Sequence, residues 1–181
     1  MTKALLVIDI QNDYFPGGKM ELVGALAAGE NAAKLQRHFR ELGLPVIHVQ
    51  HIALSPSATF FLPETYGAQI NDLVVPIGDE VTITKHFPNS FRETKLQQTL
   101  DELGVTELTV VGMMTHMCID TTVRAASEAG FTVTLVGDAC ATKDLEFEGR
   151  RVAAVDVQAS FLAAIDGSFA TVVVTDVLVE N

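Results

Sequence analysis

The chain has 181 residues, of which 48% are hydrophobic and 19% are charged, and its formal net charge at pH 7 is -11. This length and apolar content are typical of one compact domain, so we expect residues 1–181 to form a single domain. The acidic balance argues against nucleic acid or an anionic membrane as a partner, because both require clustered Lys and Arg. The two cysteines, Cys118 and Cys140, form no paired framework, and no apolar run approaches the roughly 18 residues of a membrane span. We therefore expect a cytoplasmic protein with reduced thiols.

Short runs rich in Val, Ile and Leu alternate along the chain with segments of helical period. Continuous apolar runs of this kind are typical of strands buried on both faces of a parallel sheet. The predicted strands are, in order, Ala4–Ile8, Pro45–Val49, Glu80–Thr84, Leu108–Val111, Thr132–Val136 and Thr171–Val174.

Helical stripes fill the intervals, and a glycine that can adopt the left-handed conformation follows the last turn of three of them. These stripes are Leu35, Phe39 and Leu42 before Gly43; Leu96, Leu100 and Leu103 before Gly104; and Ile119, Thr122, Val123 and Ala126 before Gly130. We predict a fourth helix from about Glu148 to Ile165. The alternation implies right-handed crossovers and an α/β fold: a doubly wound, Rossmann-like three-layer sandwich around a six-stranded parallel sheet.

The stretch from residue 53 to residue 79 interrupts this alternation. It contains Pro56, Pro63 and Pro76 and has little helical periodicity. We expect a long loop with at most a short helix, and a loop of this length in a compact domain is usually functional.

Reactive side chains follow three of the predicted strands, where ligands bind in open α/β sheets. Asp9 and Lys85 come directly after strands, and Cys118 lies six residues past Gly112, where a helical pattern begins. Unpaired N–H groups at a helix N-terminus favour thiolate over thiol, so this position suggests a nucleophile. A buried structural cysteine is the alternative for this segment taken alone.

The segment after Asp9 excludes several phosphate chemistries. No glycine precedes Gly17, so a dinucleotide or P-loop phosphate cradle is unsupported. A receiver-type fold would need paired acidic residues after the first strand, and an Asp-x-Asp phosphatase would need a carboxylate where Gln11 stands.

Three segments, in order and spacing over nearly the whole chain, carry a resemblance. They are Asp9-Ile-Gln-Asn-Asp-Tyr-Phe, Lys85 with Asn89-Ser90-Phe91, and Val111-Gly112-Met113-Met114-Thr115-His116-Met117-Cys118. The chain resembles the isochorismatase-like cysteine hydrolase superfamily. That family includes nicotinamidases, N-carbamoylsarcosine amidases, ureidoacrylate amidases, a streptothricin hydrolase and the isochorismatases.

The resemblance implies an Asp–Lys–Cys triad and, usually, a homo-oligomer, here expected to be a dimer or tetramer. Cys118 would attack an amide carbonyl and form an acyl-thioester, Asp9 would move the protons, and Lys85 would hold the carboxylate. The oxyanion hole would be the backbone N–H groups of Met114 and Cys118, with a cis peptide bond between Met113 and Met114. Candidate substrate contacts are Phe15, Phe60, Phe61, Asn89, Phe91 and Thr115.

Two other functions remain as alternatives to a cofactor-free amidohydrolase. A metal-dependent nicotinamidase would carry an Asp-x-His pair near the second strand, but Gln50 stands where the carboxylate would be, and His48 and His51 should face opposite sides of a strand. We therefore predict no metal and assign His51 to the pocket rim. A catalytically silent, oligomeric member of the fold is the other alternative. An isochorismatase needs no cysteine nucleophile, so Cys118 favours amide chemistry.

Overall fold

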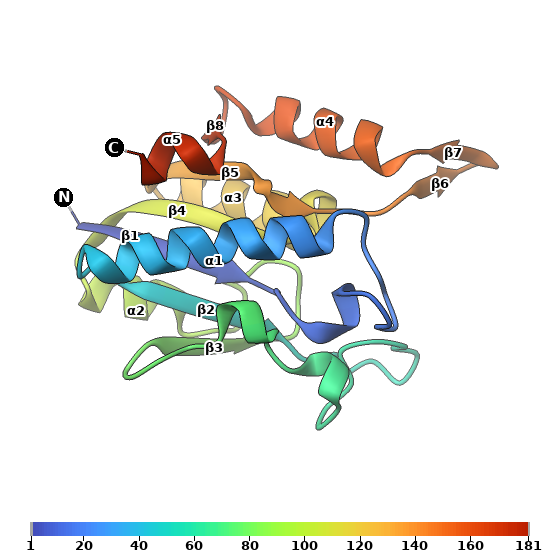
Figure 1. The fold of residues 1–181 in the computed structure, drawn as a ribbon, viewed down its shortest axis with the longest axis horizontal. Coiled ribbons are helices and arrows are strands. Elements are labelled where there is room, and N and C mark those ends of the chain that lie inside the picture. The colour runs from blue at the N-terminus through green and yellow to red at the C-terminus, as the bar shows by residue number, and fades with distance from the viewer. Residues whose placement is uncertain (1, 181) are drawn as a thin grey trace.

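The structure is a computed structural model that describes residues 2–180, and its centre is a six-stranded parallel sheet (Figure 1). The strand order is β3-β2-β1-β4-β5-β8. The strands are β1 Thr2–Ile8, β2 Val46–His51, β3 Val81–Lys85, β4 Val105–Met113, β5 Thr132–Ala141 and β8 Thr171–Val173. All six predicted strands are present; β4 is longer than predicted at both ends, and β5 continues to Ala141 instead of ending at Val136.

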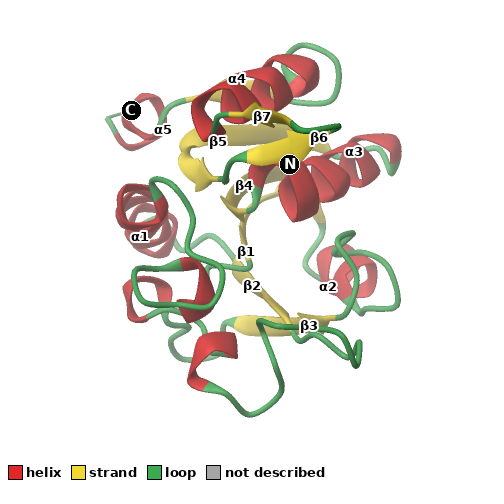
Figure 2. Ribbon diagram, turned by 90° about the vertical axis from the view of Figure 1, so that its right-hand side faces the viewer, coloured by secondary structure: helices red, strands yellow, loops and turns green. Residues whose placement is uncertain are grey.

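Helices cover both faces of the sheet, which confirms the predicted α/β sandwich (Figure 2). Side chains of β1 point alternately to the two faces, Leu5 and Val7 to one and Leu6 and Ile8 to the other. The helices are α1 Ala25–Glu41 and α5 Thr175–Val179 on the first face, and α2 Leu96–Glu102, α3 Asp120–Glu128 and α4 Ala154–Ile165 on the second. Because β1 is apolar on both sides, it lies in the middle of the sheet.

The fourth predicted helix is wrong over its first part. Residues Leu145–Phe147 and Arg150–Val152 form an antiparallel hairpin, β6 and β7, and α4 begins only at Ala154. Glu148 and Gly149 join the two strands with φ of 51° and 76°, as a tight two-residue hairpin turn requires. Together with the first turns of α4, the hairpin projects from the body of the molecule (Figure 1).

One residue of the first predicted helical stripe is also misplaced. Leu42 follows the last residue of α1 and is 58% exposed, whereas Leu35 and Phe39 are buried. The helix ends before its next turn reaches the sheet, so the last member of the stripe faces solvent.

The segment 53–79 is irregular except for two single-turn 3-10 helices, Tyr66–Ala68 and Asp72–Val74, as expected of a long loop. Residues just after β1 hold it in place. The Gln11 side-chain amide donates to the Ala68 carbonyl oxygen at 2.7 Å, and the Asp13 carboxylate accepts from the Phe61 N–H at 2.7 Å. Within residues 2–180 no helix combines the length and apolar character that crossing a bilayer would require.

The strand order reverses its direction of growth at β1. The chain builds β2 and β3 on one side of β1 and then crosses to place β4, β5 and β8 on the other side. In open parallel sheets the crevice for a ligand lies at such a switch point, beyond the carboxyl ends of the strands. The ends of β1 and β4 therefore mark the expected site.

Candidate functional site

Asp9, Lys85 and Cys118 come together at this switch point. The Lys85 Nζ lies 2.7 Å from Asp9 Oδ2 and 3.2 Å from Cys118 Sγ. The side chains of Asp9 and Lys85 are fully buried, and Cys118 is 5% exposed. Three residues that are distant in the sequence thus place a carboxylate, an ammonium and a sulfur in direct contact.

Backbone features at the ends of β1 and β4 make this approach possible. Asp9 has a φ of 52°, a left-handed conformation that Asp tolerates better than most residues, and its N–H donates to the Val49 carbonyl oxygen. Gly112 has a φ of 136°, and a Cβ there would overlap the carbonyl oxygen of Ile8. Only glycine lets β4 pass this close to the end of β1, so Gly112 sets the spacing between Asp9 and Cys118.

Cys118 lies on a π-helical turn, Thr115–Ile119, that continues into α3. Turns of this type are frequent at functional sites. The peptide bond between Met113 and Met114 is cis, as the resemblance implies. Within residues 2–180 the Met114 N–H makes no hydrogen bond. Met114 directly precedes the turn that carries Cys118, so this N–H is available to donate to a bound group there.

The groups around Cys118 shift the pKa of its thiol in opposite directions. Burial raises the pKa of its thiol, and the nearby Asp9 carboxylate raises it further, against the lowering effect of the Lys85 ammonium. The surroundings of Cys118 therefore oppose the thiolate that its position at the start of a helix would favour. The thiol needs a base, because desolvation and a neighbouring negative charge both oppose the charged form.

Asp9 is placed to be that base. Both of its carboxylate oxygens are sealed from solvent and make no hydrogen bond within residues 2–180, but Oδ2 forms an ion pair with Lys85 at 2.7 Å and Oδ1 does not. Burial lowers the pKa of Lys85, but the charges of Asp9 and Cys118 raise it, and the net shift is upward. The site therefore holds a fixed ammonium beside a carboxylate that has one oxygen available for a proton.

His51, at the end of β2, joins the cluster from a position that the sequence prediction assigned to the pocket rim. Its Nδ1 lies 3.0 Å from Lys85 Nζ. Burial, reinforced by the Lys85 ammonium, lowers the pKa of His51 to about 4, so the ring is neutral at pH 7. His48 points to the opposite face, as predicted, with its Nε2 3.0 Å from the Glu80 carboxylate.

A metal ion does not fit this donor set. Asp9, His51 and Cys118 each offer one ligating atom, and these atoms lie within 4.8 Å of one another. The ammonium of Lys85, however, already contacts all three residues at 2.7 to 3.2 Å. Ligands bind zinc at about 2.0–2.3 Å, so an ion among these atoms would lie against a positive charge.

Three of the predicted substrate contacts, Phe15, Phe60 and Phe61, lie together. Phe15 and Phe60 line a hollow of about 610 Å³ between the segment after β1 and the 53–79 loop. Neither Asp9, Lys85 nor Cys118 lines it. Buried Tyr14 and Phe61 pack beside it, with ring centroids 4.5 Å apart.

The other predicted contacts have partners elsewhere. Phe91 stacks on Phe131 with ring centroids 6.1 Å apart, in the core of the second face. Asn89 accepts the Phe91 N–H in its own turn, and the Thr115 hydroxyl donates to the Gln158 side chain at 2.6 Å. A residue that lies close in sequence to a catalytic residue therefore need not point towards the active site.

Tyr14 is a residue near the site that sequence reasoning missed. It is 2% exposed, and burial raises the pKa of its phenol, with Cys118 and Asp9 adding to the rise. Its place in the Asp9-Ile-Gln-Asn-Asp-Tyr-Phe segment was visible, but nothing in the sequence showed that the chain turns its ring back towards β1.

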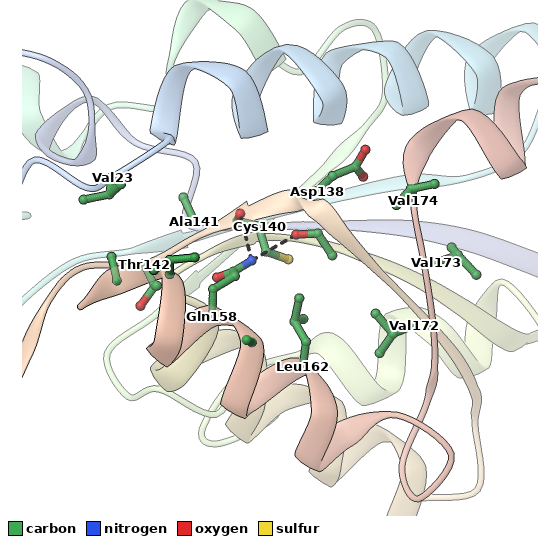
Figure 3. A pocket seen from close by; sticks show the side chains of 14 residues that line it. Val23, Asp138, Cys140, Ala141, Thr142, Gln158, Leu162, Val172, Val173 and Val174 are labelled. Atoms are coloured by element: carbon green, nitrogen blue, oxygen red, sulfur yellow. Dashed lines mark hydrogen bonds between the residues drawn. The ribbon is translucent and has the colours of Figure 1, made fainter. Parts of the chain in front are cut away.

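A larger hollow, of about 730 Å³, lies beneath α4 and is mostly apolar (Figure 3). Gln158 crosses its floor and donates to the carbonyl oxygens of Gly137 and Cys140. Its walls include Leu162 and Val172, but no member of the Asp9–Lys85–Cys118 cluster. By its size alone this hollow would be the better candidate for a substrate site, but the reactive groups lie at the switch point and not in it.

Comparison with known proteins agrees with this geometry. Residues 3–173 match the Isochorismatase domain. An uncharacterized isochorismatase family protein, YddQ of Bacillus subtilis (strain 168), is 54% identical over 97% of this chain and 98% of its own length. Nicotinamidase 3 of Arabidopsis thaliana is 31% identical over 77% of this chain and 73% of its own length.

A solved structure extends the likeness to three dimensions. The crystal structure of a protein assigned as an isochorismatase hydrolase from Oleispira antarctica superposes with a TM-score of 0.96 and 46% identity, covering 99% of this chain and 97% of the other. The family match, the close relative and the shared fold all cover the residues that build the cluster. The chain therefore belongs to the isochorismatase family of hydrolases.

Proposed function

We propose that this protein is a cysteine-dependent hydrolase of a small amide or related carbon–nitrogen substrate, acting through an acyl-thioester. The observation that carries the proposal is the Lys85 ammonium in simultaneous contact with Asp9 and Cys118, inside a buried site. A sulfur beside a base that is itself oriented by a third group is the arrangement of nucleophilic catalysis.

In the first step the sulfur of Cys118 attacks the amide carbonyl while its proton passes to Asp9. The carbonyl oxygen becomes an oxyanion, for which the backbone N–H groups of Met114 and Cys118 are the proposed donors. The unpaired Met114 N–H supports this assignment. Preorganised donors of this kind typically contribute about 10²- to 10³-fold each to turnover.

In the second step the intermediate collapses and the carbon–nitrogen bond breaks. Asp9 returns its proton to the leaving nitrogen, and the acyl group stays on Cys118. Water then attacks the thioester carbonyl, Asp9 takes a proton from that water, and the sulfur leaves and is reprotonated by Asp9. Lys85 keeps its proton throughout and balances the negative charge that alternates between carboxylate and sulfur.

The proposed substrate class is supported by a relative and by the aromatic hollow after β1. A nicotinamidase is among the relatives, and its name describes hydrolysis of a planar amide. Phe15 and Phe60, in the hollow next to Tyr14, are the aromatic side chains that we propose as substrate contacts. Asn89, Phe91 and Thr115 are engaged elsewhere and are not part of the proposal.

The test is a screen of small amides, ureas and lactams that follows released ammonia or amine. Cys118→Ala should lower turnover of any hit by more than about 10³-fold without unfolding the protein. Cys140→Ala is the matched control, because Cys140 is also buried, at 6% exposure, yet has no lysine partner. An adduct on Cys118, trapped and weighed by mass spectrometry, would identify the acyl group.

Two results would contradict the proposal. Wild-type turnover by Cys118→Ala would remove the nucleophile, and loss of activity on treatment with a chelator would instead support the metal-dependent nicotinamidase alternative.

The expected homo-oligomer stays a separate prediction. Val155 and Val174 are 72% and 51% exposed at the rim of the hollow under α4, and sedimentation velocity would measure whether a second copy covers them.

A further inference from the structure

The ammonium of Lys85 has more acceptors than hydrogens. Asp9 Oδ2 lies at 2.7 Å, His51 Nδ1 at 3.0 Å, the Phe87 carbonyl oxygen at 3.1 Å and Cys118 Sγ at 3.2 Å. A lysine ammonium donates three hydrogens, and a thiol sulfur is a weaker acceptor than a carboxylate, an imidazole nitrogen or a carbonyl. The four groups therefore compete, and the sulfur, at the longest of the four distances, receives the weakest hydrogen bond while it is protonated.

His51 is well suited to accept one of these hydrogens. Its Nδ1 accepts only when the ring is neutral with its proton on Nε2. The groups that face the ring are Lys85 and His86, whose charges oppose its protonation, together with Asp9, which favours it, and burial outweighs the carboxylate.

The orientation of the ring is also held. Gln11 grips the backbone of His51 from both sides, accepting its N–H at 2.8 Å and donating to its carbonyl oxygen at 2.8 Å. Phe61 packs beside the ring, with centroids 6.0 Å apart. His51 and Lys85 are register partners on the parallel strands β2 and β3, so their side chains lie next to each other on the same face of the sheet.

We propose that His51 is a positioning residue that takes one of the three ammonium hydrogens and so leaves Cys118 with only a long, weak hydrogen bond from Lys85, and that the sulfur stays a thiol until substrate arrives. When the sulfur loses its proton, it becomes a strong acceptor and draws a hydrogen of Lys85 towards itself. This inference rests on the proposed function only in taking Cys118 as the nucleophile.

The test compares His51→Leu, which removes the acceptor, with His51→Asn, whose Oδ1 is bonded to Cγ as Nδ1 is. The measured quantity is the rate of Cys118 alkylation by iodoacetamide as a function of pH, by mass spectrometry. In His51→Leu the freed hydrogen should stabilise the thiolate and move the midpoint down by about one pH unit, so that alkylation below the midpoint becomes about tenfold faster. His51→Asn should stay within about twofold of wild type.

Cys140 in the same molecules reports whether a variant has loosened, because it should stay unreactive while the fold is intact. An unchanged alkylation profile for His51→Leu, or equal effects of the two variants, would overturn the proposal. If Cys140 reacts in His51→Leu, the fold of that variant is disturbed, and the test is then made on the wild-type protein. There, ¹⁵N NMR of His51 at pH 7 should find Nε2 protonated and Nδ1 bare, and a proton on Nδ1 overturns the proposal.

The alkylation experiment needs no substrate, so it separates this inference from the proposed function. If the midpoint shifts as expected and no amide is hydrolysed, the proposed function fails while the role of His51 stands. If Cys118→Ala abolishes amide hydrolysis and His51→Leu leaves the alkylation profile unchanged, the proposed function stands and the proposed role of His51 fails.

Discussion

The two cysteines of this chain have the same burial and different surroundings. Cys118 is 5% exposed and Cys140 is 6% exposed; Cys118 lies on the π-helical turn that follows β4, and Cys140 lies near the end of the neighbouring strand β5. Burial raises the pKa of both thiols, that of Cys140 to about 12. Of the two, only Cys118 has an ammonium, at 3.2 Å, together with a buried carboxylate. What distinguishes a nucleophile from a structural cysteine here is its partners, not its exposure.

The surroundings of Cys140 support a structural role for it. Gly112 donates its backbone N–H to the sulfur, and Asp138 lies near enough to raise its pKa. One oxygen of the Asp138 carboxylate, Oδ1, accepts the N–H and the hydroxyl of Thr175 at the start of α5. The groups that shift the pKa of Cys140 include no cation, in contrast to those around Cys118.

The largest expected effect comes from removing the cation that only Cys118 has. Lys85→Met should lower turnover by at least about 10³-fold and should cost about 3–5 kcal/mol of unfolding free energy, because it leaves the Asp9 carboxylate buried without its partner. Amide hydrolysis and urea unfolding measure the two effects.

The double variant Asp9→Asn/Lys85→Met is the control for this loss of stability. It removes both charges, so it should recover most of the unfolding free energy while staying inactive. A Lys85→Met protein as active as wild type would erase the distinction between the two cysteines.

A smaller effect is expected from changing the spacing between the strands. Gly112→Ala would push β4 away from β1, since the new Cβ would overlap the Ile8 carbonyl oxygen, and its φ of 136° disfavours any other residue. We expect a loss of roughly 3 kcal/mol in unfolding free energy and a large loss of turnover, as Asp9 and Cys118 separate.

Gly130→Ala offers a matched control for Gly112→Ala. Gly130 has a φ of 95° with no atom within 4 Å of its would-be Cβ, so this substitution should cost only about 1 kcal/mol and leave turnover unchanged. Equal effects of the two substitutions on activity would mean that the strand spacing does not set the cluster.

The smallest effect concerns the acid side of stability. The pKa of His51 is lowered from 6.5 to about 4, so between these values the unfolded chain binds a proton that the folded chain does not. The stability contributed by neutral His51 is therefore present above about pH 6.5 and is lost as the pH falls towards 4.

We expect wild type to lose on the order of 1 kcal/mol more than His51→Asn between pH 7 and pH 5, because partial exposure weakens the effect. Urea unfolding at the two pH values measures it. Identical losses in the two proteins would place the acid sensitivity elsewhere, for example at His48, whose pKa burial also lowers.

The strands and the three reactive residues were predictable for a simple reason. Strands buried on both faces are continuous apolar runs, and a polar residue that follows such a run must lie at the edge where parallel strands end together. Asp9 and Lys85 satisfy this rule directly. Cys118 does so through Gly112, and β1, β3 and β4 carry the three residues to one place.

The errors came from local chemistry that competes with periodicity. Apolar spacing favoured a helix from Glu148, but Glu148 and Gly149 adopt a hairpin turn, so helix α4 starts later. Phe91 stands next to a motif, yet its ring stacks on Phe131 in the core. Periodicity reports which residues are apolar, not which of several buried environments each one enters.

The sequence by itself determined the sheet, the order of its elements and the identity of the carboxylate, ammonium and thiol, because these depend on local apolar runs and residue type. Tertiary structure alone decided which groups surround Cys118, which atoms Lys85 contacts and where His51 lies in the cluster. These depend on distances of about 3 Å between residues that are far apart in the chain, and on the removal of water around them. No pattern along one strand contains that information.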